Sequence, residues 1–180
     1  MSITLREYHA LAMRTSPRDG HDKIDNGMLG LIGETGELVD VYKKWVYQST
    51  PGADLPVDRL ADELGDVLWY LAEIADGMER EIADVVKADF DGLLAPYGNT
   101  KLLPPIRKAV IDLAHDAMTI ERSRNFDCVS VYMRVALEHA AILARIIGVP
   151  LDVIAERNIE KLRKRYPVQF DPRISEARYE

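Results

Sequence analysis

Two pairs of acidic residues in this sequence share one spacing. Glu34 and Glu37 are three positions apart, and Glu63 and Asp66 repeat that spacing. Residues three apart on an α-helix project from the same face. If the two pairs lie on neighbouring antiparallel helices, the two acidic faces meet. The spacing therefore predicts that four carboxylates converge at one place.

Four carboxylates at close range repel one another, so they cannot all stay ionised unless a positive charge lies between them. Carboxylate oxygens are ligands for hard divalent cations, so we expect these four residues to bind Mg²⁺, for which Mn²⁺ substitutes. Mg²⁺ keeps positions for water and substrate phosphates, which suits a phosphate-ester hydrolase. A solvated helix face is the competing interpretation of any single pair, whereas two pairs within apolar sequence favour a metal site.

Apolar residues and glycines surround the acids. Trp69 closely follows Asp66, and apolar residues flank the glutamates, so the acids lie among expected core residues. Gly30, Gly33 and Gly36 recur at every third position. Each glycine inside a helix costs about 1 kcal/mol relative to alanine. We therefore expect a neighbouring helix or a ligand to approach closely beside the acids.

A second group of residues near position 160 is suited to phosphate binding. Asn158, Lys161 and Arg165 share one helix face at spacings of three and four. The two cations can neutralise phosphate oxygens, and Asn158 can donate or accept a hydrogen bond. Tyr166 and Lys44 are further candidates for substrate contact. Cations near a helix C-terminus also interact favourably with the helix dipole, which is the structural alternative.

The elements that position these residues are helices, because helical periodicity dominates and no run of strict alternation occurs. Proline and glycine clusters separate the helical segments. We expect helices at about Thr4–Met13, Ile24–Tyr47, Val57–Asp76, Arg80–Leu94, Pro105–Arg122, Val129–Ile147 and Leu151–Arg165. Short loops favour antiparallel neighbours, so the predicted fold is all-α, an antiparallel bundle of about six or seven helices.

The chain also contains a weak internal repeat. Residues 24–97, which carry the acids, align with residues 105–167. The corresponding acidic positions are Glu34 with Asp112 and Glu63 with Glu138. We interpret the second segment as the degenerate copy of a duplication, which supplies a scaffold and the phosphate-side helix. The alternative is a chance alignment of amphipathic helices, and either way we expect one acidic site per chain.

Composition limits the classes of protein. The chain has 180 residues, is 47% hydrophobic and carries a formal charge of 23 − 30 = −7. A negative surface argues against nucleic-acid and membrane partners, because both repel it. The single cysteine, Cys128, indicates a reducing compartment, and we expect it to be a small buried residue. No apolar stretch is long enough for a signal peptide or a membrane span, so we expect a cytoplasmic protein.

Three stretches resemble, in sequence and in order, the MazG-like, all-alpha nucleoside triphosphate pyrophosphohydrolases of the phage type. They are Leu29–Lys44 (LGLIGETGELVDVYKK), Leu60–Ala72 (LADELGDVLWYLA) and Asn158–Pro167 (NIEKLRKRYP). With the leader His9–Thr15 they cover about 50 residues. The family's ExxE and ExxD pairs, which hold Mg²⁺, fall on the four acids. About 70 extra residues, Glu79 to Gly148, lie between the second and third stretches, so the sequence leaves open whether Asn158 and Lys161 reach the acids within one chain or across a subunit interface.

The resemblance implies a single MazG-like domain over residues 1–180 that hydrolyses (deoxy)nucleoside triphosphates to a monophosphate and pyrophosphate. Metal-activated water attacks the α-phosphorus, and one carboxylate, that of Glu34 or Glu37, acts as general base. Lys161 and Arg165 then meet the charge of the leaving pyrophosphate. The four acids are thus the expected catalytic residues as well as the metal ligands. Family members usually assemble, so a homodimer or tetramer is expected, in the host cytoplasm if the chain is phage-encoded.

The preferred substrate stays open at this point. A deoxynucleoside triphosphate such as dGTP is one candidate. Hydrolysis of dUTP or dUDP, as in the related dimeric dUTPases, is the enzymatic alternative. A helical module that binds a nucleotide or a partner without catalysis is the alternative of another class.

Overall fold

The computed structural model describes residues 2–16, 20–94, 103–123, 125–168 and 170. All regular structure in these residues is helical, which confirms the predicted all-α class. The helices are α1 (Leu5–Met13), α2 (Gly20–Gln48), α3 (Val57–Gly77), α4 (Ile82–Val86), α5 (Phe90–Leu93), α6 (Ile106–Arg122), α7 (Phe126–Ile147) and α8 (Leu151–Arg165).

Local sequence signals explain most of the helix boundaries. Thr4 and Glu7 form a reciprocal capping box at the start of α1. Prolines precede α3, α6 and α8, where the missing amide hydrogen removes no helical hydrogen bond. Gly148 ends α7 with a φ of 77°, a conformation that glycine adopts without steric cost. The predicted long helices therefore begin and end within a few residues of the expected positions.

The predicted helix over residues 80–94 is wrong, because the structure divides it into α4 and α5. Lys87 has a φ of 53°, in the left-handed region, and it ends α4. A carboxylate oxygen of Asp89 accepts hydrogen bonds from the backbone amides of Phe90 at 2.8 Å and Leu5 at 2.7 Å. The contact with Leu5 joins distant parts of the chain. Asp89 thus bonds to another element at the point where the predicted helix is interrupted.

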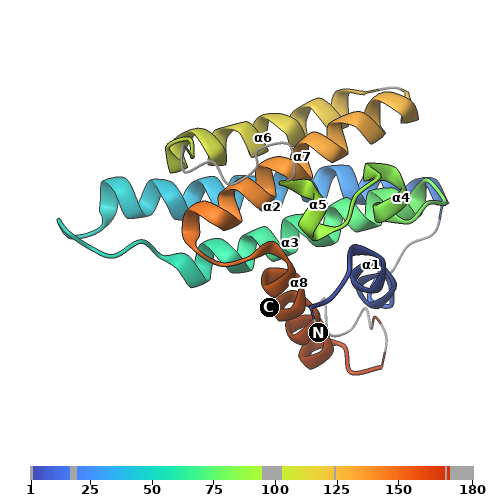
Figure 1. Ribbon diagram of the computed structural model, residues 1–180, viewed down its shortest axis with the longest axis horizontal. Coiled ribbons are helices and arrows are strands. Elements are labelled where there is room, and N and C mark those ends of the chain that lie inside the picture. The colour runs from blue at the N-terminus through green and yellow to red at the C-terminus, as the bar shows by residue number, and fades with distance from the viewer. Residues whose placement is uncertain (1, 17–19, 95–102, 124, 169, 171–180) are drawn as a thin grey trace.

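Helix α3 lies at the centre of the molecule, and its side chains from Leu71 to Ala75 are fully buried. It packs along α2, and the α6–α7 pair packs against these two helices. Helices α1 and α8 pack against α3 on another side, as Figure 1 shows with α1 and α8 below α3 and α6 and α7 above it. The long helices α2 and α3 thus share one interface and leave α3 accessible to α8.

Two glycines allow α2 and α3 to approach closely. A Cβ atom on Gly27 would lie 2.7 Å from Cγ1 of Ile74, and one on Gly30 would overlap the ring of Tyr70. The expected close approach is therefore confirmed at Gly30. In the part of the chain that the structure describes, no neighbouring helix approaches Gly33 or Gly36, around which a Cβ would meet nothing within 4 Å, so there the approach of a ligand stays a prediction. A step of three residues turns a helix by about 300°, which is short of a full turn. Glycines at every third position therefore lie progressively further from the helix face that contacts α3.

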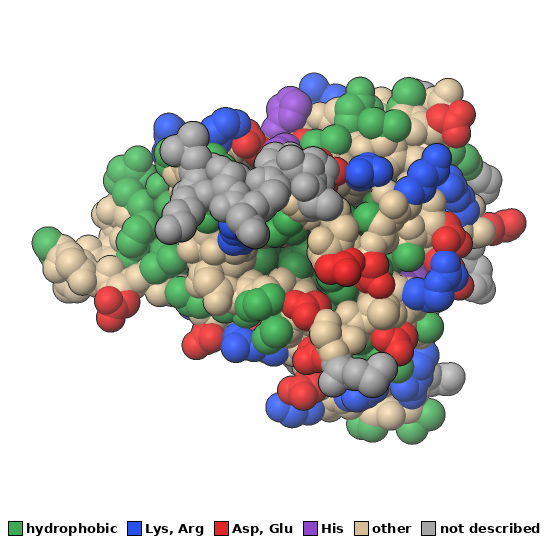
Figure 2. Space-filling view, viewed as in Figure 1, with side chains coloured by type: hydrophobic (Ala, Val, Ile, Leu, Met, Phe, Trp, Pro, Cys, Tyr) green, Lys and Arg blue, Asp and Glu red, His purple; other side chains and the backbone are tan. Residues whose placement is uncertain are grey.

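The surface in Figure 2 carries acidic and basic side chains interspersed with hydrophobic ones. Across the described residues, every helix is too short or too polar to span a bilayer. The expectation that Cys128 is buried is wrong, because this side chain is exposed. It lies in the first turn of α7, where Phe126 and Asp127 are also exposed and burial begins only at Val129.

Candidate metal centre

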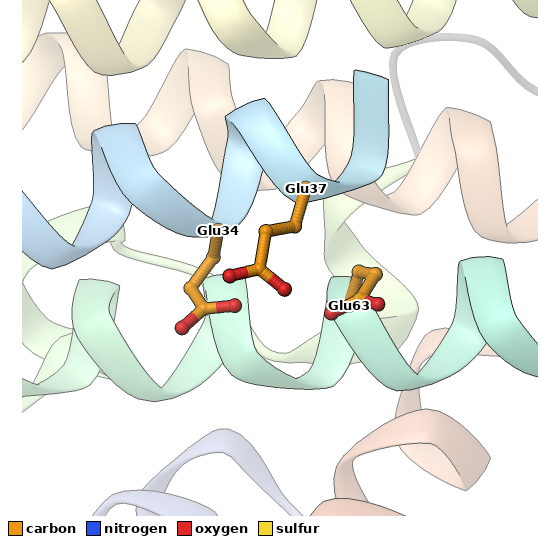
Figure 3. Close-up of side chains that lie close together, drawn as sticks. All are labelled: Glu34, Glu37 and Glu63. Atoms are coloured by element: carbon orange, nitrogen blue, oxygen red, sulfur yellow. The ribbon is translucent and has the colours of Figure 1, made fainter. Parts of the chain in front are cut away.

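Three of the four predicted carboxylates lie together between α2 and α3. One carboxylate oxygen from each of Glu34, Glu37 and Glu63 lies within 4.8 Å of the other two. Figure 3 shows Glu34 and Glu37 extending from α2 toward α3, which carries Glu63. The three-residue spacing puts the first two on one helix face, and antiparallel packing brings the third opposite them. The structure thereby places these three residues as the sequence predicts.

The carboxylates of the cluster are partly buried and repel one another. Burial, together with the negative charges of Asp66, Glu37 and Glu63, raises the pKa of Glu34 to about 7. Burial and the charges of Glu37 and Asp66 also raise the pKa of Glu63. The nearby ammonium of Lys161 lowers both values but does not offset the other effects. The oxygen donors and their mutual repulsion fit a hard divalent cation, which would supply the missing charge.

The fourth predicted carboxylate, Asp66, is held by α8. Lys161 Nζ donates to Asp66 Oδ2 at 2.5 Å, and Asn158 Nδ2 donates to Asp66 Oδ1 at 3.0 Å. Asp66 also contributes to the charge felt by Glu34, so it borders the glutamate cluster while bonding to α8. Asn158 and Lys161 thus reach Asp66 within one chain.

The other predicted substrate residues lie further from the cluster. Arg165 is one turn beyond Lys161, with its guanidinium carbon 5.8 Å from the centre of the Tyr166 ring. Tyr166 is buried and packs against Phe170. Lys44 forms an ion pair with Asp40 at 2.5 Å, two helical turns beyond Glu37. The substrate roles of these residues stay predictions.

Sequence reasoning missed Tyr8 and Gly65, which support this arrangement. The Tyr8 side chain is fully buried on α1, and its hydroxyl lies 3.0 Å from Asn158 Oδ1. A Cβ on Gly65 would lie 3.1 Å from the Asn158 Cβ, so the glycine makes room for α8. Tyr8 shares an apolar helix face with Leu5 and is indistinguishable by pattern from an ordinary core residue. The sequence therefore held no signal for its hydroxyl contact.

Comparison with known proteins identifies the class of the segment that holds the acids. Residues 23–88 match the MazG nucleotide pyrophosphohydrolase domain. This stretch contains all four predicted carboxylates and the α2–α3 interface, and it is similar to the MazG domain, as the resemblance implies. Tyr8, Asn158 and Lys161 lie outside the matched segment.

One relative comes from a bacteriophage. The chain is 33% identical over 67 residues to the Gene 37 protein of Mycobacterium phage L5. The matched stretch covers 36% of this chain and 58% of that protein. The chain thus spans little more than half the length of this relative. No solved structure gave a significant match. The relation to dimeric dUTPases is not tested by these matches and stays a prediction.

Proposed function

We propose that this chain is a Mg²⁺-dependent pyrophosphohydrolase that converts (deoxy)nucleoside triphosphates to a monophosphate and pyrophosphate. The observation that carries this proposal is the cluster of Glu34, Glu37 and Glu63 oxygens within 4.8 Å of one another, inside the MazG-like segment. Glutamates at such distances repel one another. A divalent cation that bridges the two helices would offset this repulsion, which together with burial raises the pKa values of Glu34 and Glu63.

Glu34, Glu37 and Glu63 would hold the cation, and Asp66 borders them as a further ligand. A bound Mg²⁺ supplies positive charge to the substrate phosphates and lowers the pKa of a coordinated water. The carboxylate of Glu34 or Glu37 accepts the proton of the attacking water.

Lys161 supplies the phosphate side of the proposed site. Its ammonium lies 2.5 Å from Asp66, so a triphosphate bound beside the acids comes within reach of it. Arg165 lies one turn away and extends the positive charge along α8. These two cations stabilise the negative charge that develops on the leaving pyrophosphate.

A substrate panel tests the proposed activity. The purified chain is incubated with each ribo- and deoxynucleoside triphosphate, including dGTP and dUTP, and with dUDP, in Mg²⁺, Mn²⁺ or EDTA. We expect monophosphate and pyrophosphate in equal amounts from the triphosphates, and no reaction in EDTA. Preference for dGTP supports the proposed selectivity, and preference for dUTP with turnover of dUDP supports the dUTPase alternative. Absence of both turnover and Mg²⁺ binding contradicts the proposal and favours a binding module.

Substitution of Lys161 separates phosphate binding from metal binding. We expect Lys161→Met to lower kcat/KM by about tenfold or more, because a charge-assisted contact contributes about 1.5–3 kcal/mol. Mg²⁺ affinity, measured by titration calorimetry, should not fall, because the substitution removes a cation that competes for Asp66.

The matched control is Lys108→Met, which removes a lysine that pairs with Asp112 on α6. It should leave both quantities unchanged. Equal kcat/KM in the Lys161 variant and the wild type contradicts the assigned phosphate role.

A further inference from the structure

A chain of hydrogen bonds connects the interior of α1 to the edge of the carboxylate cluster. The hydroxyl of Tyr8 contacts Asn158 Oδ1 at 3.0 Å, and Asn158 Nδ2 contacts Asp66 Oδ1 at 3.0 Å. Tyr8 is 0% exposed and Asn158 is 4% exposed, so solvent does not compete with the bond between them, whereas Asp66 is partly exposed. Three helices that are distant in sequence therefore meet at one carboxylate.

The direction of these bonds follows from the chemistry of the partners. An ionised carboxylate accepts hydrogen bonds and donates none, so the amide nitrogen of Asn158 must face Asp66. The amide oxygen then faces Tyr8, which must donate its hydroxyl proton. Burial and the charge of Asp66 raise the pKa of Tyr8 well above its ordinary value, so this hydroxyl remains a donor. Tyr8 thereby pairs with the amide oxygen in the orientation that Asp66 requires and supports that orientation, while its hydroxyl also lies 3.5 Å from the Gly65 carbonyl oxygen.

Gly65 permits this geometry from the α3 side. Its neighbour Asp66 faces α8, and a Cβ at position 65 would lie 3.1 Å from the Asn158 Cβ and 3.2 Å from Nδ2. Such contacts are tight enough to displace the Asn158 side chain. The lack of a side chain at residue 65 thus allows α8 to bring its amide into contact with Asp66.

We propose that Tyr8 is a positioning residue of the metal site, which acts through Asn158 to orient the Asp66 carboxylate. This inference rests on the proposed function. Groups that hydrogen-bond metal-binding side chains fix the orientation of those ligands, and their loss typically lowers metal affinity by about 10- to 100-fold. Tyr8 lies on α1, before the MazG-like segment begins at residue 23. The site therefore depends on a residue that neither the acidic pattern nor the family match identifies.

The test is Tyr8→Phe, which removes the hydroxyl and keeps the ring that fills the core. We expect Mg²⁺ affinity, measured by titration calorimetry without substrate, to fall by about tenfold. In activity assays the Mg²⁺ concentration for half-maximal rate should rise in parallel. The control is Thr15→Val, which removes another buried hydroxyl of the α1 region that bonds Trp69 and Ala12. It should reduce thermal stability but leave Mg²⁺ affinity unchanged.

A double-mutant cycle shows whether Tyr8 acts through Asn158. If it does, Tyr8→Phe weakens Mg²⁺ binding in the wild type and has no further effect in an Asn158→Ala background. Equal effects in both backgrounds overturn the proposed route, and unchanged Mg²⁺ affinity in Tyr8→Phe overturns the role itself. If wild type neither binds Mg²⁺ nor hydrolyses a nucleotide, the proposed function fails first.

Gly65→Ala gives a second variant that does not depend on the stability of Tyr8→Phe. Alanine favours the helix by about 1 kcal/mol, so the fold should be retained. Displacement of Asn158 should nevertheless weaken Mg²⁺ binding several-fold, and undiminished binding in this variant contradicts the proposal.

Discussion

Glu37→Gln and Glu63→Gln should each reduce nucleotide turnover by at least about 10²-fold while the fold survives. Each substitution retains the size of the side chain but removes one negative charge from the cluster of three carboxylates. The loss of charge weakens metal binding and the electrostatic stabilisation that the metal provides. Steady-state hydrolysis in saturating Mg²⁺ measures the effect, and helical circular dichroism verifies the fold.

The matched control is Glu138→Gln on α7. Glu138 corresponds to Glu63 in the hypothetical internal repeat, but its carboxylate pairs with Arg134 at 3.0 Å. We expect this variant to retain wild-type turnover, because each chain should hold one acidic site. Full activity in both cluster variants excludes the assigned site, whereas loss of activity in Glu138→Gln indicates a second site.

Glu34→Gln should stabilise the metal-free protein at pH 8 even though it removes activity. The pKa of Glu34 is about 7 in the folded protein, against an ordinary value of 4.5, because of burial and the neighbouring acids. The folded chain therefore retains a proton that the unfolded chain releases. The free energy of unfolding falls as the pH rises from about 4.5 through 7, and glutamine removes this dependence.

Thermal unfolding in EDTA at pH 5 and pH 8 measures this effect. After allowance for solvent screening of a partly exposed group, we expect a gain of about 1–2 kcal/mol at pH 8. For a chain of this size, such a gain raises Tm by several degrees, about 2–4 °C per kcal/mol. The difference should shrink at pH 5. Added Mg²⁺ should raise the Tm of the wild type more than that of the variant.

Glu160→Gln, on the exposed face of α8, serves as the control and should show no such pH dependence. If the Glu34→Gln protein is less stable than the wild type at pH 8 in EDTA, the inference that ionised Glu34 destabilises the folded protein is contradicted. Stability gained by the loss of a functional carboxylate is typical of active sites that hold unfavourable charge.

Much of the fold follows from local signals in the sequence. The prolines before α3, α6 and α8 and the glycine after α7 act on the residues next to them, so their effects are readable without a structure. The break between α4 and α5 is different, because Asp89 bonds to Leu5 across the fold. No local pattern records that contact, and periodicity alone therefore predicts one helix where two short ones occur.

The candidate site likewise contains residues whose positions follow from local spacing and residues whose positions depend on the packing of distant helices. Spacing on adjacent antiparallel helices predicts the meeting of Glu34, Glu37 and Glu63. The position of Asp66 depends in addition on how α8 crosses α3, which the packing of the whole bundle determines. Tyr8 contributes through one hydroxyl on an apolar helix face, and a hydroxyl leaves no periodic signature. The acids, Asn158 and Lys161 could thus be predicted from sequence, while the contact of Tyr8 with Asn158 could not.

The most direct test of the central claim is hydrolysis in ¹⁸O-labelled water, with ³¹P NMR and mass spectrometry of the products. We predict that a preferred triphosphate yields monophosphate and pyrophosphate, with ¹⁸O in the monophosphate alone, because water attacks the α-phosphorus. The reaction should require Mg²⁺ or Mn²⁺ and should be lost in Glu63→Gln. Label in the pyrophosphate, products of diphosphate and inorganic phosphate, or undiminished turnover in Glu63→Gln would contradict it.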